Sequence, residues 1–109
     1  MGKYKREQIA GVYRVYEPIS GESFIGYSYN VLGTFNRWKL EFAMNACTVR
    51  ALQQFWNEHN GNIEMEILEK IPLAPDTEPD PEELEDSLQA IAKHYVANYK
   101  NAHLLQVEG

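Results

Sequence analysis

Residues 11–27 read GVYRVYEPISGESFIGY, two short apolar stretches on either side of a segment rich in turn-forming residues. The first stretch, Val12 to Tyr16, and the second, Phe24 to Tyr27, are built from β-branched and aromatic residues, which fit the surface of a sheet. Pro18 and Gly21 between them favour a turn. This segment therefore predicts a β-hairpin.

Two helices are expected after the hairpin. The apolar residues here are spaced more like those of a helix than of a strand, namely Leu32, Phe35, Trp38, Leu40 and Phe42. They predict a helix from about Thr34 to Met44, although Gly33 leaves its start open. Thr48 is the expected N-cap of a second helix, and the run His59-Asn60-Gly61 would end it.

A third strand and a last helix complete the pattern. Residues 62–70 alternate apolar and acidic side chains, the period of a strand with one buried face, and residues 72–81 hold four prolines, which predicts an extended loop. Asp80 is placed to cap the following helix, with Pro81 at its first position. An apolar stripe on that helix should pack on the sheet: Leu84, Leu88, Ile91 and Tyr95.

These elements predict an α+β fold in the order β-β-α-α-β-α, with a small three-stranded antiparallel sheet flanked by helices. The 109 residues suit a single domain over residues 1–109, with its core in about residues 10–100. A chain of this length can bury enough surface to fold alone.

The charge is divided unevenly along the chain, whose net charge is −6. Residues 1–50 hold seven Lys or Arg against four acids, whereas residues 51–109 hold three against twelve, seven of them between Asp76 and Asp86. The first half could therefore face phosphate, which the second half would repel. The acidic run is read as a solvated face, or else as a mimic of nucleic acid that docks a basic partner.

The composition excludes several protein classes. The lone cysteine, Cys47, can form no internal disulfide, and the three histidines have no spacing typical of a zinc site. No apolar run approaches the roughly 20 residues that a membrane span needs. We therefore expect a soluble, cytoplasmic protein without membrane contact.

The hairpin carries a pair of short motifs, Gly11-Val12-Tyr13 and Phe24-Ile25-Gly26, followed by Arg37-Trp38-Lys39. Together they resemble the signature of the GIY-YIG nuclease superfamily, with the phage homing endonuclease catalytic domains as the most similar type. The likeness continues to about Pro72. It implies DNA phosphodiester hydrolysis with Mg²⁺ or Mn²⁺.

The resemblance also implies roles for three residues. Tyr13 matches the tyrosine that lies against the attacking water as its base, and Arg37 is matched to the helix arginine that binds the scissile phosphate. Glu85 is matched to the glutamate that ligates the metal, with Glu82 and Asp86 as competing choices. The chemistry fits, because developing phosphate charge needs a cation and a hard metal prefers carboxylate oxygen.

Two positions depart from the family pattern. Phe24 replaces the second motif's tyrosine and lacks its hydroxyl, and Thr34 occupies the position of the family's arginine. Either a three-residue insertion or a shift of three along the helix would bring Arg37 to the same face. Alternatively, Arg37 is a surface residue whose aliphatic part packs on Trp38 or whose guanidinium pairs with Glu41. The alternative for Tyr13 is a strand tyrosine that packs in the core.

Further contacts are expected around these residues. Substrate binding is assigned to Gly26, Ser28, Tyr29 and Lys39, although Ser28 could instead cap the next segment. Tyr27 or Tyr29 could replace the missing hydroxyl of Phe24. The sequence thus predicts a metal-dependent DNA endonuclease, and the alternative is a catalytically degenerate module of the same fold that binds nucleic acid or a protein.

Overall fold

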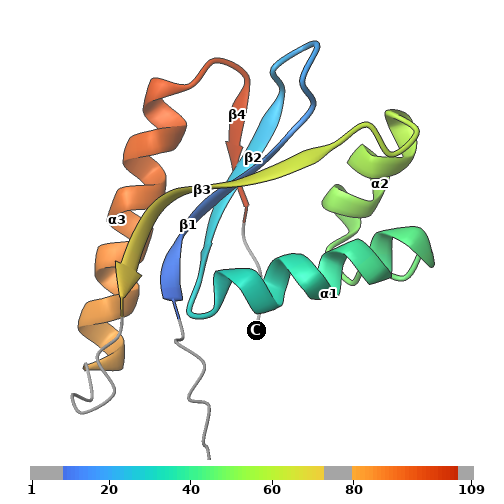
Figure 1. Ribbon diagram of the computed structural model, residues 1–109. Helices are drawn as coiled ribbons and strands as arrows, with labels where there is room; N and C mark the ends of the chain where they lie inside the picture. Colours follow the sequence, from blue (N-terminus) through green and yellow to red (C-terminus); the bar gives the residue numbers. More distant parts are fainter. Residues whose placement is uncertain (1–8, 73–79, 106–109) are drawn as a thin grey trace, which may run out of the picture.

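The computed structural model describes residues 9–72 and 80–105, which form a sheet with helices on both faces (Figure 1). The α+β class and the order of the first six elements are confirmed, but a seventh element follows them. The elements are β1 (Ile9–Tyr16), β2 (Ser23–Ser28), α1 (Val31–Ala43), α2 (Arg50–Glu58), β3 (Glu64–Pro72), α3 (Pro81–Asn98) and β4 (Ala102–Leu104).

The sheet has four strands in the order β3-β1-β2-β4, so the predicted three-stranded antiparallel sheet is wrong. Strand β1 pairs antiparallel with both β2 and β3, but β4 pairs parallel with β2, from Ser23 opposite Ala102 to Ile25 opposite Leu104. Because parallel neighbours need a long crossover, β4 depends on α3 returning the chain to the sheet edge. Three residues carry no periodicity that would reveal it.

Several predicted boundaries are shifted. Helix α1 begins at Val31 rather than Thr34, because the Asn30 side chain accepts a hydrogen bond from the Gly33 N–H and caps the helix. The N-cap of α2 is Val49, without a side-chain cap bond, so the prediction of Thr48 is wrong.

The ends of β3 and α3 bound the proline-rich segment. Strand β3 runs two residues later than predicted, through Pro72, and α3 begins at Pro81 as expected. The side chain of Asp80 accepts a hydrogen bond from the Glu82 N–H, which confirms its cap. Residues 73–79 of the predicted loop lie outside the described residues.

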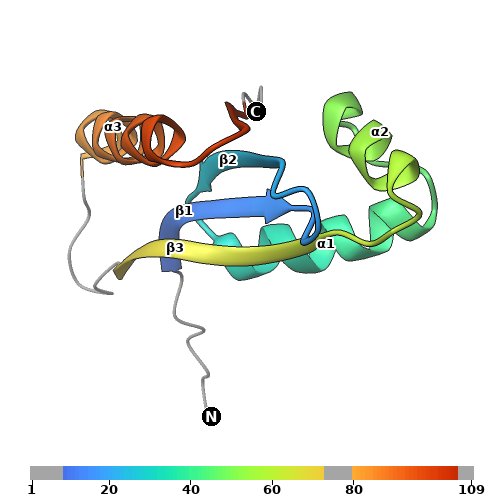
Figure 2. The same cartoon turned by 90° about the horizontal axis from the view of Figure 1, so that it is seen from above.

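Two apolar clusters lie on opposite faces of the sheet, beneath the helices that Figure 2 shows on either side of it. Helices α1 and α2 cover the face that carries Tyr13 and Val15, while α3 covers the face that carries Val12 and Ile25. The predicted stripe on α3 packs in the second cluster: Leu84, Leu88, Ile91 and Tyr95. Alternation along β1 and β2 therefore divides the motif residues between two faces.

A β-bulge lies where the first motif meets β3. Val12 pairs with Glu69 and Tyr13 with Ile67, so Leu68 is the extra residue on β3. The bulge brings the Glu69 carbonyl oxygen so close to Gly11 that a Cβ there would collide with it. The first motif's glycine is therefore required by close backbone approach.

No helix within residues 9–72 and 80–105 is long and apolar enough to cross a membrane.

Candidate active site

A cavity of about 850 Å³ opens at the sheet edge where β4 ends. Strand β4 covers β2 only as far as Ile25, so the second half of β2, Gly26–Ser28, has no neighbour on that side within the described sheet. Residues from α1 and from α3 both reach the cavity, although the two helices cover opposite faces. Its lining consists of Tyr13, Tyr27, Ser28, Tyr29, Thr34, Arg37, Trp38, Glu85, Gln89, Lys93, Leu104 and Leu105.

Tyr13 reaches this edge by crossing over Gly26, its partner on β2. A Cβ at position 26 would lie 2.7 Å from the Tyr13 hydroxyl and 3.0 Å from its Cζ, where ordinary contacts are 3.4 to 4 Å. The Tyr13 ring also makes edge contacts with Phe35 and Trp38, at centroid distances of 5.9 and 5.3 Å. Gly26 therefore provides the space that lets the phenol reach the cavity.

The Tyr13 phenol is almost fully buried yet lines the cavity. Burial raises its pKa well above the usual value for tyrosine, and the positive charge of Arg37 opposes this only partly. Among residues 9–72 and 80–105 its hydroxyl forms no hydrogen bond. Tyr13 thus presents a neutral O–H group that is free to bind a water molecule or a phosphate oxygen.

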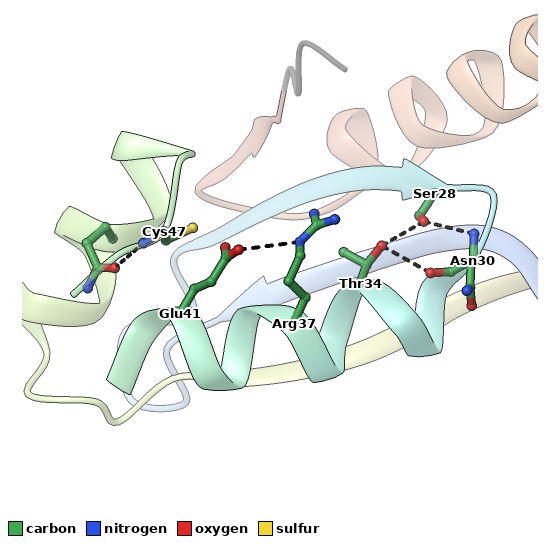
Figure 3. Close-up of polar contacts among 7 residues, drawn as sticks. Ser28, Asn30, Thr34, Arg37, Glu41 and Cys47 are labelled. Atoms are coloured by element: carbon green, nitrogen blue, oxygen red, sulfur yellow. Dashed lines mark hydrogen bonds and ion pairs between the residues drawn. The ribbon is translucent and has the colours of Figure 1, made fainter. Parts of the chain in front are cut away.

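Arg37 projects from α1 toward the same space (Figure 3). Its Nε lies 3.7 Å from Glu41 Oε2, one turn further along the helix, and its side chain is 58% exposed. Within the described chain, its two terminal amino groups make no ion pair or hydrogen bond. The guanidinium can therefore bind an anion while Glu41 holds its inner nitrogen.

Thr34 also lines the cavity, three residues before Arg37 on α1. Its hydroxyl lies 2.8 Å from Ser28 Oγ and donates to the Asn30 carbonyl oxygen at 3.0 Å (Figure 3). Ser28 Oγ also accepts from the Asn30 N–H. These bonds join the end of β2 to the start of α1, so Ser28 both lines the cavity and stabilises the turn.

Glu85 enters the cavity from α3 and accepts a hydrogen bond on each carboxylate oxygen. Tyr27 donates to Oε2 at 2.9 Å and Tyr29 to Oε1 at 3.3 Å, while Gln89 donates to the Tyr27 hydroxyl at 3.2 Å. Burial, followed by the negative charge of Glu85, raises the pKa of Tyr29; burial is also the main cause of the raised pKa of Tyr27. Both phenols therefore remain donors that fix the carboxylate.

The two hydrogen bonds from Tyr27 and Tyr29 leave Glu85 able to bind a divalent cation. An ionised carboxylate has about four lone-pair sites, so two tyrosine bonds leave sites on both oxygens of Glu85. Mg²⁺ is commonly held by one or two carboxylates together with water and substrate phosphate. Within the described parts of the chain, no three His, Cys, Asp or Glu side chains group to hold a metal ion.

Phe24 lies away from this chemistry. Its ring packs against Phe55 and His103, at centroid distances of 5.1 and 5.3 Å, and it is not among the cavity's lining residues. In the β1–β2 register, Phe24 is opposite Val15 rather than Tyr13. Two other tyrosine hydroxyls, those of Tyr27 and Tyr29, line the cavity instead.

Five of the seven predicted site residues line the cavity, namely Tyr13, Ser28, Tyr29, Arg37 and Glu85. Gly26 lies beneath the Tyr13 phenol, and Lys39 is exposed on α1 outside the cavity lining. Glu82 and Asp86, the competing carboxylates, are exposed on α3 and do not line it either. A helix turns about 100° per residue, so Lys39 lies on a different face from Arg37.

Sequence reasoning missed Gln89 and Lys93. Together with Glu85 they form an i, i+4, i+8 row on α3, and all three line the cavity. The same spacing rule that identified the apolar stripe on this helix would have identified the polar row beside it. Leu104 and Leu105 could not be found this way, because they reach the cavity only through β4.

Comparison with solved structures identifies the same architecture elsewhere. The structure resembles the catalytic domain of homing endonuclease I-TevI with a TM-score of 0.65 and 16% sequence identity, over 90% of this chain and 99% of that one. A mutant of that intron endonuclease's catalytic domain aligns with a TM-score of 0.66 and 17% sequence identity. This alignment covers 94% of this chain and 100% of the mutant domain. No protein-family model matches the sequence, and the search of curated proteins found no match either. The chain therefore has the fold of the I-TevI catalytic domain, which confirms the resemblance to the GIY-YIG nucleases at the level of the fold.

Proposed function

We propose that this protein is an endonuclease of the GIY-YIG type, which hydrolyses DNA phosphodiester bonds with a divalent metal. The observation that carries the proposal is that Tyr13, Arg37 and Glu85, from β1, α1 and α3, line one cavity. These three groups supply the functions that phosphodiester hydrolysis needs: a group that orients water, a cation for phosphate and a carboxylate for a hard metal.

Tyr13 acts on the attacking water in this proposal. Because burial keeps its phenol neutral, its oxygen accepts a hydrogen bond from the water and holds it beside the phosphorus. The ring is fixed by Phe35 and Trp38, so the oxygen has little freedom to move. Such positioning lowers the activation barrier by removing the entropy cost of orienting the water.

Arg37 binds the scissile phosphate. Its two terminal amino groups can donate parallel hydrogen bonds to two phosphate oxygens, on which charge accumulates in the transition state. The ion pair with Glu41 restrains the side chain at Nε without occupying these donors. Thr34 cannot replace this charge, although it lines the same cavity.

Glu85 would hold Mg²⁺ or Mn²⁺, with the hydroxyls of Tyr27 and Tyr29 fixing its carboxylate. A bound divalent ion supplies Lewis acidity that stabilises charge on the phosphate and the leaving oxygen.

Cleavage of supercoiled plasmid tests the proposal. In Mg²⁺ or Mn²⁺ the wild type should nick the plasmid, whereas Tyr13→Phe, Arg37→Gln and Glu85→Gln should each reduce the rate by about 100-fold or more. Lys70→Gln, an exposed change on β3 outside the cavity lining, is the control and should retain the rate. The proposal would be refuted if the wild type cleaved neither plasmid nor single-stranded circular DNA faster than Tyr13→Phe does.

A module of the same fold that binds without cutting is the second candidate. It is favoured by Thr34 in place of the family's arginine and by the position of Phe24 outside the cavity. Stable binding of DNA or a protein by a wild type that fails to nick plasmid would favour this candidate.

A further inference from the structure

We propose that Lys93 is a second phosphate-binding residue of the cavity and that the cavity accepts one unpaired DNA strand in preference to a duplex. The inference rests on the proposed function, since it names the substrate of the same site. It is carried by the positions of the cations and tyrosines that line the cavity and of the acids at the start of α3.

Two cations line the cavity from opposite sides of the sheet. Arg37 comes from α1 and Lys93 from α3, and the described residues place no carboxylate within ion-pair distance of Lys93. At a rise of about 1.5 Å per residue, Lys93 lies about 12 Å along α3 from Glu85. It would therefore contact a different phosphate from the one beside Glu85.

Aromatic side chains share the cavity lining with these cations. Tyr27 and Tyr29 both line the cavity, and Tyr29 is 40% exposed. Sites for single-stranded nucleic acid combine cations that follow the backbone with aromatic rings on which unpaired bases stack. The bases of a duplex are already stacked on one another and cannot use these rings. The cavity thus offers contacts that only an unpaired strand can make.

The exposed acids at the start of α3 disfavour a second strand. The first two turns of α3 and its cap present a group of exposed carboxylates that do not line the cavity: Asp80, Glu82, Glu83 and Asp86. A duplex carries one negative charge per about 1.7 Å, twice the density of one strand in the same geometry. Because the protein has a net charge of −6, it repels a duplex more strongly than a single strand. The cavity's volume of about 850 Å³ is also in the range of pockets that enclose a small ligand.

Fluorescence anisotropy with a labelled 15-nucleotide strand and its duplex, both in EDTA, tests the inference. We expect the wild type to bind the single strand at least about tenfold more tightly. Lys93→Gln should weaken that binding and reduce the salt dependence of log K by about 0.7, the slope for one phosphate contact. Lys100→Gln, an exposed change beyond the end of α3, should leave the slope unchanged.

A double change, Glu82→Gln with Glu83→Gln, should narrow the preference by improving duplex binding. Equal or tighter binding of the duplex, an unchanged slope in Lys93→Gln, or binding of neither probe would overturn the inference. Thermal melting confirms that each variant folds. Because EDTA removes cleavage from this assay, the two proposals fail separately. Strand preference without cleavage of either plasmid or single-stranded circular DNA in Mg²⁺ would contradict only the proposed function. Nicking without the preference refutes only the inference.

Discussion

Replacement of Gly26 by alanine should disrupt the position of Tyr13. The new Cβ would lie 2.7 Å from the Tyr13 hydroxyl, so the two must separate by about 0.7 Å to reach the 3.4 Å of an ordinary contact. The phenol cannot easily retreat, because Phe35 and Trp38 pack against its ring. Such overpacking costs about 1 to 3 kcal/mol of unfolding free energy.

Thermal and urea unfolding measure this cost. A loss of about 2 kcal/mol should lower the Tm by about 9 °C in a domain of 109 residues. The cleavage rate should fall by about 100-fold, because a displacement near 1 Å is enough to spoil the alignment of a reacting group. Val15→Ala on the same face is the control, since it should destabilise comparably without touching the hydroxyl.

A double-mutant cycle isolates the contact. In the Tyr13→Phe background the nearest ring atom, Cζ, is 3.0 Å from the new Cβ, so Gly26→Ala should cost less by about 1 kcal/mol. If Gly26→Ala destabilised both backgrounds equally, within about 0.3 kcal/mol, the hydroxyl would not lie over Gly26 and the reasoning would be refuted.

Three further predictions concern charge and capping. Burial raises the pKa of Tyr13 in the folded protein, so above about pH 10 the unfolded chain ionises this tyrosine before the folded protein does. In urea melts above that pH, the wild type should therefore lose unfolding free energy relative to Tyr13→Phe. A difference between the two proteins that does not change with pH would contradict this. Asp80→Ala should lower the unfolding free energy by about 1 kcal/mol through loss of the α3 cap, and no change in urea melts would refute the cap. Arg14→Ala should lower the unfolding free energy by about 1 to 2 kcal/mol in the same melts. The Arg14 guanidinium lies over the Tyr16 and Tyr99 rings and pairs with Glu66. An unchanged urea midpoint would be inconsistent with those contacts.

The hairpin and the helices could be predicted because their signals are local. Alternation around Tyr13 and Ile25, the Asp80 cap and the apolar stripe of α3 each depend on neighbours a few residues apart in sequence. The start of α1 at Val31 differs from the predicted Thr34, because Gly33 leaves the start of the helix open in the sequence. In the structure Gly33 donates its N–H to Asn30, within the first turn, where a capped helix tolerates glycine.

The fourth strand and the cavity could not be predicted in the same way. Strand β4 has three residues and pairs with β2, about 80 positions earlier, so no local pattern specifies it. Within the described residues, β4 pairs with β2 only as far as Ile25, and the cavity opens beside the rest of β2. Lys93 lines it from α3, whereas Lys39 on α1 does not.

The most direct test of the central claim is a crystal structure of the protein with Mn²⁺ and a short DNA strand. We predict an anomalous manganese peak about 2.0 to 2.3 Å from a carboxylate oxygen of Glu85, with a phosphate bound by Arg37 and a water molecule at the Tyr13 hydroxyl. Manganese bound away from Glu85, or DNA bound outside the cavity, would contradict it.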